Sequence, residues 1–289
     1  MVFQLSSVAQ YVYARPYKTT ALVAFCLGGC FYLTKRRNSK SFPKSALAKP
    51  GLVVLHGFGP TKTVVSSSPF VLKLQTFLRM ANIKYVHDPK NHFGRKGKMP
   101  WIELDGKDYC DSTFIIEFLR ERFNLKIDNN LNEQQQSLAR VIQKTIEENT
   151  LWAMIAYPRF VEDFEWFRQT SDLPWIVGIA FRIAIIPSIK KSMNRHGIGR
   201  HSPEEIRHIA KGDVKALSNL LNDKKYFLGD EPSTIDAVVF GFLANVLCGL
   251  RNGSWPNQMI KKEAPNLVAF FERMKEKYWP DWDQLIEKA

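Results

Sequence analysis

The sequence predicts an α/β N-terminal domain followed by an all-α C-terminal domain, with a membrane helix in front of both. Three observations support this prediction. Strand-like and helix-like segments alternate from residue 51 to 126, helical patterns dominate from Leu131 onward, and an uncharged apolar run occupies residues 19–34. We therefore expect four parts: a membrane anchor (1–37), a linker (38–50), the α/β domain (51–126) and the helical domain (127–289).

The basic charge of the chain is concentrated near its N-terminus. The 289 residues carry a formal net charge of +13, and residues 1–50 hold eight Lys and Arg and no acid. Removing those eight from the 41 basic residues leaves 33 against 28 acids, so the other 239 residues carry only +5. This balance offers no basic groove, and we expect no nucleic-acid partner.

Residues 19–34 (TTALVAFCLGGCFYLT) contain no charge, and Lys35-Arg36-Arg37 follows directly. As a helix they rise about 24 Å, and flanking Lys and Tyr side chains can extend that length to both membrane interfaces. We interpret them as a single-pass membrane anchor, with a cleaved signal peptide or a buried helix as alternatives. More basic residues follow the segment than precede it, which predicts that the soluble part faces the cytosol. The organelle stays open among the mitochondrial outer membrane, endomembranes and lysosomes.

The α/β domain begins with Gly51–Phe58, a β-branched apolar run that predicts the first strand. Ser68 followed by Pro69 predicts a helix start, because Ser is a common N-cap residue and Pro is favoured in the first turn. The apolar residues behind them share one helix face: Phe70, Leu74, Phe77 and Leu78. Ile83–Val86 predicts the second strand.

The segment KMPWIELDGKDYCDSTFIIEFL, Lys98 to Leu119, predicts a hairpin followed by a helix. Pro100 cannot donate to a sheet, so it fits the first residue of a strand or a special turn. Asp105-Gly106 predicts a tight turn between strands 101–104 and 107–110. Asp111 and Ser112 are N-cap residue types that open an amphipathic helix.

The order strand, helix, strand, connection, Pro, hairpin, helix is that of a thioredoxin-like unit. Met99-Pro100 resembles the cis-proline turn of glutathione transferases, and Asp111-Ser112 resembles their acidic-Ser pair. The resemblance implies a cis Pro100, a Met99 backbone that pairs with the cysteinyl unit of glutathione, and a γ-glutamyl group held at the helix N-terminus by Asp111 and Ser112. Glutathione would be a substrate, and we expect no cofactor and no metal.

Helical patterns in the second half cover residues 132–156, 202–221, 233–250 and 264–277. Ser233 is followed three residues later by Asp236, the spacing of a capping box. The pair resembles the motif that opens the core helix of transferase C-terminal domains. We expect it to have a structural role.

Several longer segments of the sequence resemble one particular family within this fold. The segments SPFVLKLQTFLRMA, GKMPWIE, FIIEFL, HGIGRHSPEEI and DKKYFLG resemble the failed axon connections family, which includes cadmium-responsive proteins and is related to the mitochondrial metaxins. The resemblance implies a glutathione transferase-like fold and a role in axon development or in the response to metal stress.

Whether the chain is an enzyme depends on the start of its first helix. Ser68 resembles, by its position before Pro69, the residue that activates the thiol in omega-type transferases, and Ser66 and Ser67 are near enough to serve instead. The Ser68 hydroxyl could donate to a thiolate, or it could serve only as an N-cap. Two functions therefore stay open: a membrane-anchored interaction or assembly module with a protein partner or a second copy, and a glutathione-dependent transferase or reductase in detoxification.

An apolar run, Asp172–Lys191 (DLPWIVGIAFRIAIIPSIKK), predicts a further helix. We expect it to be buried over the cleft between the domains; a membrane-surface or partner-binding helix and a second span are the alternatives. His196, His201 and His208 follow, but lack a neighbouring Cys or carboxylate at the spacing of a metal site.

Overall fold

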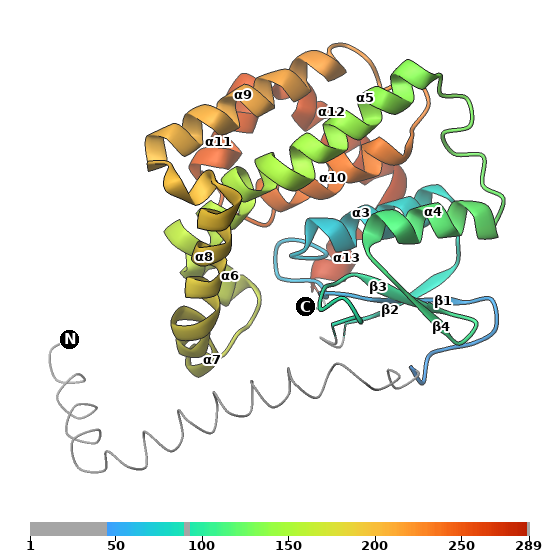
Figure 1. Cartoon of the computed structure of the whole chain (residues 1–289), viewed down its shortest axis with the longest axis horizontal. Coiled ribbons are helices and arrows are strands. Elements are labelled where there is room, and N and C mark those ends of the chain that lie inside the picture. The colour runs from blue at the N-terminus through green and yellow to red at the C-terminus, as the bar shows by residue number, and fades with distance from the viewer. Residues whose placement is uncertain (1–44, 90–92, 288–289) are drawn as a thin grey trace, which may run out of the picture. The chain divides into compact units, whose positions relative to one another are not determined.

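The computed structural model describes residues 45–89 and 93–287 (Figure 1). The predicted anchor, residues 19–34, lies outside the described residues. Among the residues that are described, none of the helices combines the length and the apolar character that a membrane crossing requires.

The N-terminal domain is built on a four-stranded sheet. Its strands are β1 (Val53–His56), β2 (Tyr85–Asp88), β3 (Trp101–Leu104) and β4 (Lys107–Cys110), in the order β2-β1-β3-β4. β1 is parallel to β2 because helix α3 (Pro69–Met80) provides the crossover between them. β3 is antiparallel to both β1 and β4. The mixed sheet confirms the thioredoxin-like prediction.

Helices α3 and α4 (Ser112–Arg122) cover one face of this sheet (Figure 1). Successive strand residues point to opposite faces, so alternate residues of β1 and β3 share one core with both helices. The core members are fully buried or nearly so: Val53, Leu55, Leu74, Phe77, Ile102, Leu104, Ile115 and Leu119.

The residues just before β1 are bonded to the sheet. The Ser45 amide donates to Glu103 Oε2 at 3.0 Å, and the Gly51 amide donates to Asp105 Oδ1 at 2.8 Å. The last part of the predicted linker, residues 45–50, therefore packs against the domain in this structure.

All regular elements after α4 are helical in the described part of the chain. The first long helix runs from α5 (Glu133–Lys144) through π-helical segments η2 (Thr145–Thr150), η3 (Trp152–Ala156) and η4 (Pro158–Glu162). The remaining elements are α6 (Phe164–Thr170), α7 (Trp175–Ala180), η5 (Phe181–Ile185), α8 (Ile186–His196), η6 (Ile198–Arg200), α9 (Pro203–Leu221), α10 (Thr234–Leu247), α11 (Trp255–Glu263), α12 (Pro265–Tyr278) and α13 (Trp282–Glu287).

Helix α10 begins at the predicted capping box, which is confirmed. The backbone amide and the hydroxyl of Ser233 both donate to Asp236 Oδ2 at 2.7 Å, and the Phe227 amide donates to Oδ1 at 2.9 Å. Burial raises the pKa of the Asp236 carboxyl to about 6, against the three donors, which lower it. The carboxylate thus ties the preceding loop to the first turn of the helix.

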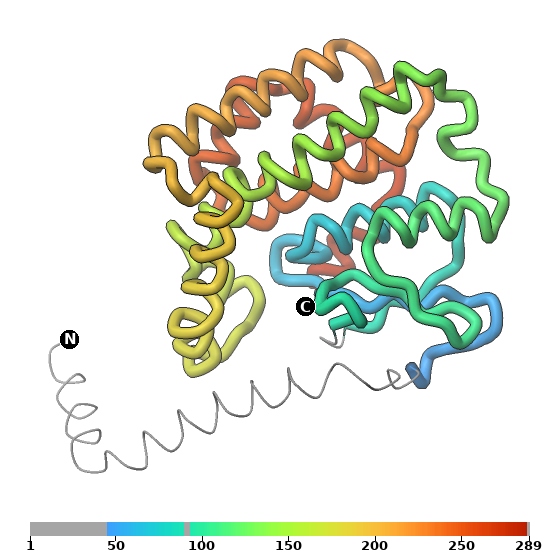
Figure 2. Tube along the Cα trace, in the orientation of Figure 1, coloured from blue at the N-terminus to red at the C-terminus, as the bar shows by residue number. Residues whose placement is uncertain are grey.

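The two domains are joined where α10 crosses α3, which can be followed along the trace in Figure 2. Gly241 lies at this crossing. A Cβ atom at Gly241 would lie 2.5 Å from the carbonyl oxygen of Pro69 and 2.9 Å from the amide nitrogen of Lys73. Only a residue without a side chain allows the two helix backbones to approach so closely.

The prediction that Asp172–Lys191 is buried is wrong. The segment forms α7, η5 and the start of α8, which extend from the rest of the helical domain (Figure 1). Its large apolar side chains are exposed, among them Trp175 at 69% and Ile183 at 66%. The segment projects from the domain and contacts too little of the chain to bury both of its faces.

We expect Gly241→Ala to lower the free energy of unfolding by roughly 1–3 kcal/mol, because the added methyl group would press on the backbone of α3. The matched control is Gly212→Ala in the middle of α9, where a Cβ would meet no atom within 4 Å. That change should stabilise the protein by about 0.5–1 kcal/mol, because Ala favours the helix. Urea unfolding measures both, and a neutral Gly241→Ala would contradict the close packing.

Candidate functional site

The connection into β3 contains a cis peptide bond between Met99 and Pro100, as the resemblance implied. Met99 and Pro100 line a pocket of about 550 Å³ together with Asp111 and Ser112. The structure thus brings together the four residues that the sequence assigned to glutathione binding. They meet because the turn before β3 and the N-terminus of α4, which follows β4, lie at the same edge of the sheet.

Asp111 is the N-cap of α4. Its Oδ1 accepts from the amides of Thr113 at 3.0 Å and Phe114 at 3.4 Å, while the residue itself is exposed. Ser112, the first residue of the helix, is buried. The helix N-terminus therefore presents a carboxylate, together with the positive end of the helix dipole, to the pocket.

The opposite wall of the pocket comes from the helical domain. Its residues belong to α5 and the segments that continue it: Arg140, Lys144, Glu147, Glu148, Leu151 and Trp152. Lys98 adds a further cation beside Met99. Cations and carboxylates thus line the pocket together, and they suit a ligand that carries both an ammonium and a carboxylate group, such as a short peptide.

A buried ion pair lies under the pocket. Lys73 Nζ of α3 donates to Glu147 Oε1 at 2.7 Å and to Thr113 Oγ1 at 2.9 Å. Gln143 Nε2 donates to the same Thr113 hydroxyl at 2.8 Å and to Glu147 Oε2 at 3.0 Å. Burial lowers the pKa of the Lys73 ammonium, against the attraction of Glu147. This network connects α3 and α4 to the helical domain.

The four members of this network were not predicted from the sequence. Lys73 carried a usable signal, because it lies three residues after Phe70 and four before Phe77, on the face of α3 that the apolar pattern assigned to the core. A Lys at such a position needs a buried partner. The partner, Glu147, lies 74 residues away in sequence and on another domain, so it could not be found without the fold.

Ser68 lies at a different place from the other predicted site residues. It is the N-cap of α3, as predicted, and its Oγ accepts from the Val71 amide at 3.4 Å. Ser68 is not among the residues that line the pocket, whereas Phe70 is. The neighbouring Ser66 donates its hydroxyl to the Phe58 carbonyl at 2.8 Å.

A buried arginine from the helical domain holds this loop. Arg159 Nη1 donates to the Ser67 carbonyl at 2.6 Å, and Nη2 donates to Asn245 Oδ1 of α10 at 2.8 Å. Asn245 Nδ2 in turn donates to the Ser66 carbonyl at 3.3 Å. Burial lowers the pKa of the Arg159 guanidinium to about 10. Hydrogen bonds thus fasten the loop before α3 to the helical domain.

The three histidines do not assemble into one site. His201 precedes α9, which begins at Pro203, so it shares no helix face with His208. His196 stacks on Trp152, with ring centroids 5.3 Å apart. Within residues 45–89 and 93–287, no three His, Cys, Asp or Glu side chains form a group that could hold a metal ion.

The domains resemble those of glutathione transferases. The family model of the glutathione S-transferase N-terminal domain matches residues 69–164, and that of the C-terminal domain matches residues 210–274. Among solved structures, the beta-etherase LigF from Sphingobium sp. strain SYK-6 superimposes with a TM-score of 0.57 at 19% identity, covering 82% of this chain and 99% of the other. This likeness establishes the fold.

Relatives of known name are similar over most of the chain. Failed axon connections of Drosophila melanogaster is 31% identical over 82% of this chain, which spans 60% of that protein's length. The isoprene-epoxide–glutathione S-transferase of Rhodococcus sp. strain AD45 is 29% identical over 78% of this chain and 99% of its own. Metaxin-2 of Mus musculus is 23% identical over 76% of this chain and 85% of its own.

The buried ion pair gives a test of how the two domains are joined. Lys73→Met should lower the free energy of unfolding by about 3–5 kcal/mol, because it leaves the Glu147 carboxylate buried without its partner. The double variant Lys73→Met with Glu147→Leu should recover most of that loss. Urea unfolding of both variants measures the difference.

The control is the exposed pair Lys144–Glu148, which lies on the long helix that also carries Glu147. Its side chains are 45% and 61% exposed. Lys144→Met should change stability by less than about 0.5 kcal/mol. If Lys73→Met is equally mild, the network does not join the domains.

Proposed function

Because the chain is a glutathione transferase-fold protein related to Failed axon connections and the metaxins, we propose that it is a membrane-anchored interaction and assembly module. Residues 19–34 form its anchor in this proposal, and the folded unit faces the cytosol. The fold serves as a rigid body that meets one or more proteins, or a second copy of the chain. We infer that thiol transfer is not its main task.

The start of α3 carries this proposal. Thiol activation in this fold needs a hydroxyl or thiol at that helix N-terminus that can reach the bound thiol. Here Ser68 is buried, caps the helix through its oxygen and does not line the pocket. The Ser66 hydroxyl is bonded to Phe58, and Arg159 binds the Ser67 carbonyl. This corner therefore takes part in fastening one domain to the other, and its Ser68 hydroxyl is not among the groups that line the pocket.

The metaxin likeness also supports a location. We propose the mitochondrial outer membrane as the first membrane to test, with endomembranes and lysosomes as the alternatives. Imaging of the tagged full-length chain decides among them. The setting implied by the family, axon development or the response to metal stress, stays a prediction.

A second candidate function is a glutathione-dependent transferase or reductase in detoxification. The pocket formed by Met99, Pro100, Asp111 and Ser112 favours it, since this site offers a carboxylate and a helix N-terminus to a zwitterionic peptide. The similarity to the Rhodococcus transferase over nearly that enzyme's full length points in the same direction. In this reading Ser68 would donate its hydroxyl to the thiolate.

Turnover separates the two functions. With glutathione and a general electrophile, we expect the full-length protein to show no rate above the uncatalysed reaction. Ser68→Ala should leave that result unchanged and lower stability by about 1 kcal/mol, the usual value of an N-cap. Turnover that falls strongly in Ser68→Ala would instead establish the enzyme.

Cross-linking tests whether the protein is part of an assembly. After cross-linking in its native membrane, the 33.3 kDa chain should be recovered mainly in complexes of higher mass that contain the same protein partner or a second copy. Recovery of the single chain alone would contradict the proposal.

The pocket can be tested by calorimetry with glutathione. If glutathione binds, Asp111→Ala should weaken binding roughly tenfold to a hundredfold, because it removes a charge-assisted hydrogen bond to the ligand ammonium. Asp283→Ala, an acid that is 78% exposed and does not line this pocket, is the control and should leave affinity unchanged. Equal affinities for wild type and Asp111→Ala would remove Asp111 from the binding site.

A further inference from the structure

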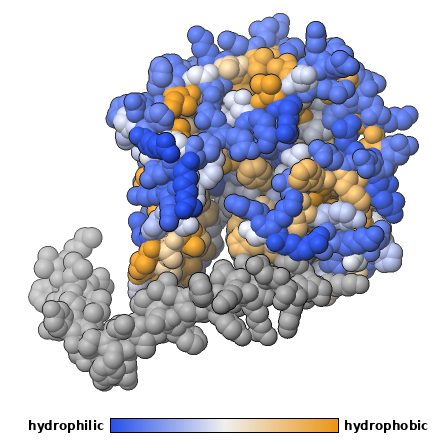
Figure 3. Space-filling model, viewed as in Figure 1, coloured by the Kyte–Doolittle hydropathy of each residue, from blue (hydrophilic) through white to orange (hydrophobic). Residues whose placement is uncertain are grey.

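Residues 175–196, here called the α7–α8 arm, expose apolar side chains along one side. Ile176, Ile179 and Ile183 are spaced by three and four residues, so they share a helix face. Their side chains are 59%, 44% and 66% exposed, and Trp175 beside them is 69% exposed. Figure 3 shows this apolar surface over α7, at the lower left of the coloured unit. So much exposed apolar surface in one place is typical of a docking site.

The charges of the arm have one sign. Its 22 residues contain four basic residues and no acid: Arg182, Lys190, Lys191 and Arg195. All four are exposed, and hydrophilic residues cover α8 next to the apolar tip (Figure 3). Within the described residues, no carboxylate lies within ion-pair distance of the three basic residues of α8.

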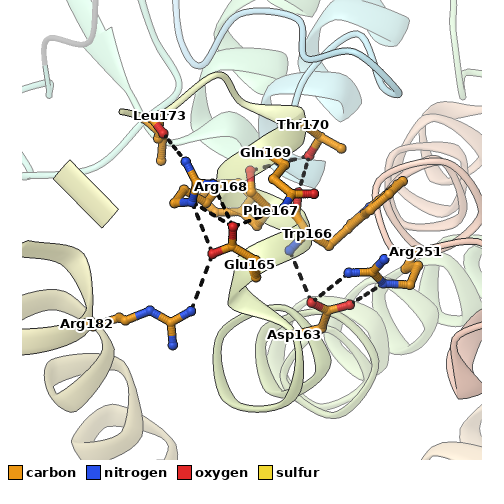
Figure 4. Close-up of polar contacts among 10 residues, drawn as sticks. All are labelled: Asp163, Glu165, Trp166, Phe167, Arg168, Gln169, Thr170, Leu173, Arg182 and Arg251. Carbon is orange, nitrogen blue, oxygen red and sulfur yellow. Dashed lines mark hydrogen bonds and ion pairs between the residues drawn. The ribbon is translucent and has the colours of Figure 1, made fainter. Parts of the chain in front are cut away.

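Helix α6 contacts one side of the arm, as Figure 4 shows. Glu165 accepts from Arg168 at 2.6 Å and lies 3.6 Å from Arg182, and Arg168 also donates to the Leu173 carbonyl at 2.8 Å. Asp163 caps α6 by accepting from the Trp166 amide and also pairs with Arg251 in the loop after α10. The arm is therefore held on the side that faces α6, while its apolar side chains are exposed.

We propose that the α7–α8 arm lies on an anionic lipid surface. Trp175, Ile176 and Ile183 would enter the headgroup region, and the basic residues of α8 would face lipid phosphates. An apolar stripe with an aromatic residue beside an all-basic polar face is the composition of helices that lie in a membrane interface. Each Lys or Arg near such a surface adds attraction. We favour a lipid surface because it offers an apolar depth and negative charge together; contact with an acidic protein is the other outcome of the test.

The arm does not cross the membrane in this proposal. Arg182 lies near the middle of the apolar part and would be costly within the bilayer core. The predicted anchor ends at Thr34, and the ten residues between it and Ser45 reach at most about 35 Å. If the anchor is present, the folded unit stays near the bilayer and the arm meets lipid at a high effective concentration.

Fluorescence of the full-length protein in vesicles tests the proposal. The vesicles contain brominated phosphatidylcholine, with or without phosphatidylserine, and bromine quenches a Trp that reaches the lipid. The difference between wild type and Trp175→Phe isolates one indole. We expect Trp175 to be quenched in vesicles with phosphatidylserine, less in phosphatidylcholine alone, and less as salt increases.

Two sets of variants test the apolar and the basic residues of the arm separately. Ile176→Ser with Ile183→Ser should abolish the quenching of Trp175, and Val141→Ser, which changes a side chain 60% exposed on α5, should leave it unchanged. Lys190→Glu with Lys191→Glu should weaken the lipid contact about tenfold or more. Circular dichroism checks that each variant keeps its helix content.

Three outcomes would overturn the proposal. These are no quenching of Trp175 with phosphatidylserine, equal quenching with and without it, and a photoreactive residue at position 183 that cross-links to a protein or to a second copy in place of lipid.

Discussion

The close approach of α10 to α3 at Gly241 is the constraint on which the rest of this structure depends. Because no side chain separates the two backbones there, the first turn of α3 lies directly against the core helix of the other domain. Asn245, one turn further along α10, then reaches the loop before α3. The same placement lets α5 and its continuation form the wall of the pocket opposite α4.

Two buried cations make this junction specific. Lys73 is paired with Glu147, whereas Arg159 binds a backbone carbonyl and an amide side chain. Burying a charge is costly unless its hydrogen bonds are well formed, so each group tolerates only one arrangement of the domains. The candidate pocket lies next to the Lys73 ion pair, and the loop at the start of α3 lies next to Arg159. The geometry of both places is therefore set by contacts between the domains.

The molecule presents two separate surfaces on this frame. The pocket lies between the domains, is lined by both charged and apolar side chains and suits a small zwitterionic ligand. The arm is apolar and basic and projects from the helical domain. Residues 175–196 also lie between the stretches that match the two transferase domain models. The proposed docking surface is therefore separate from both matched stretches.

The sequence alone determined the order of strands and helices, because those signals are local. Caps such as Ser68, Asp111 and the Ser233–Asp236 pair act within one helical turn, and alternating or helical apolar patterns act within one element. The resemblance to transferases also identified the cis Pro100 and the residues that meet around it.

Tertiary structure decided which apolar segment is covered. The composition of residues 172–191 indicates that they need an apolar environment, but not whether the chain or another surface supplies it. Tertiary structure also decided the partners of Lys73 and Arg159. These contacts join segments 74 and about 90 residues apart in the sequence, so they exist only once both domains are packed.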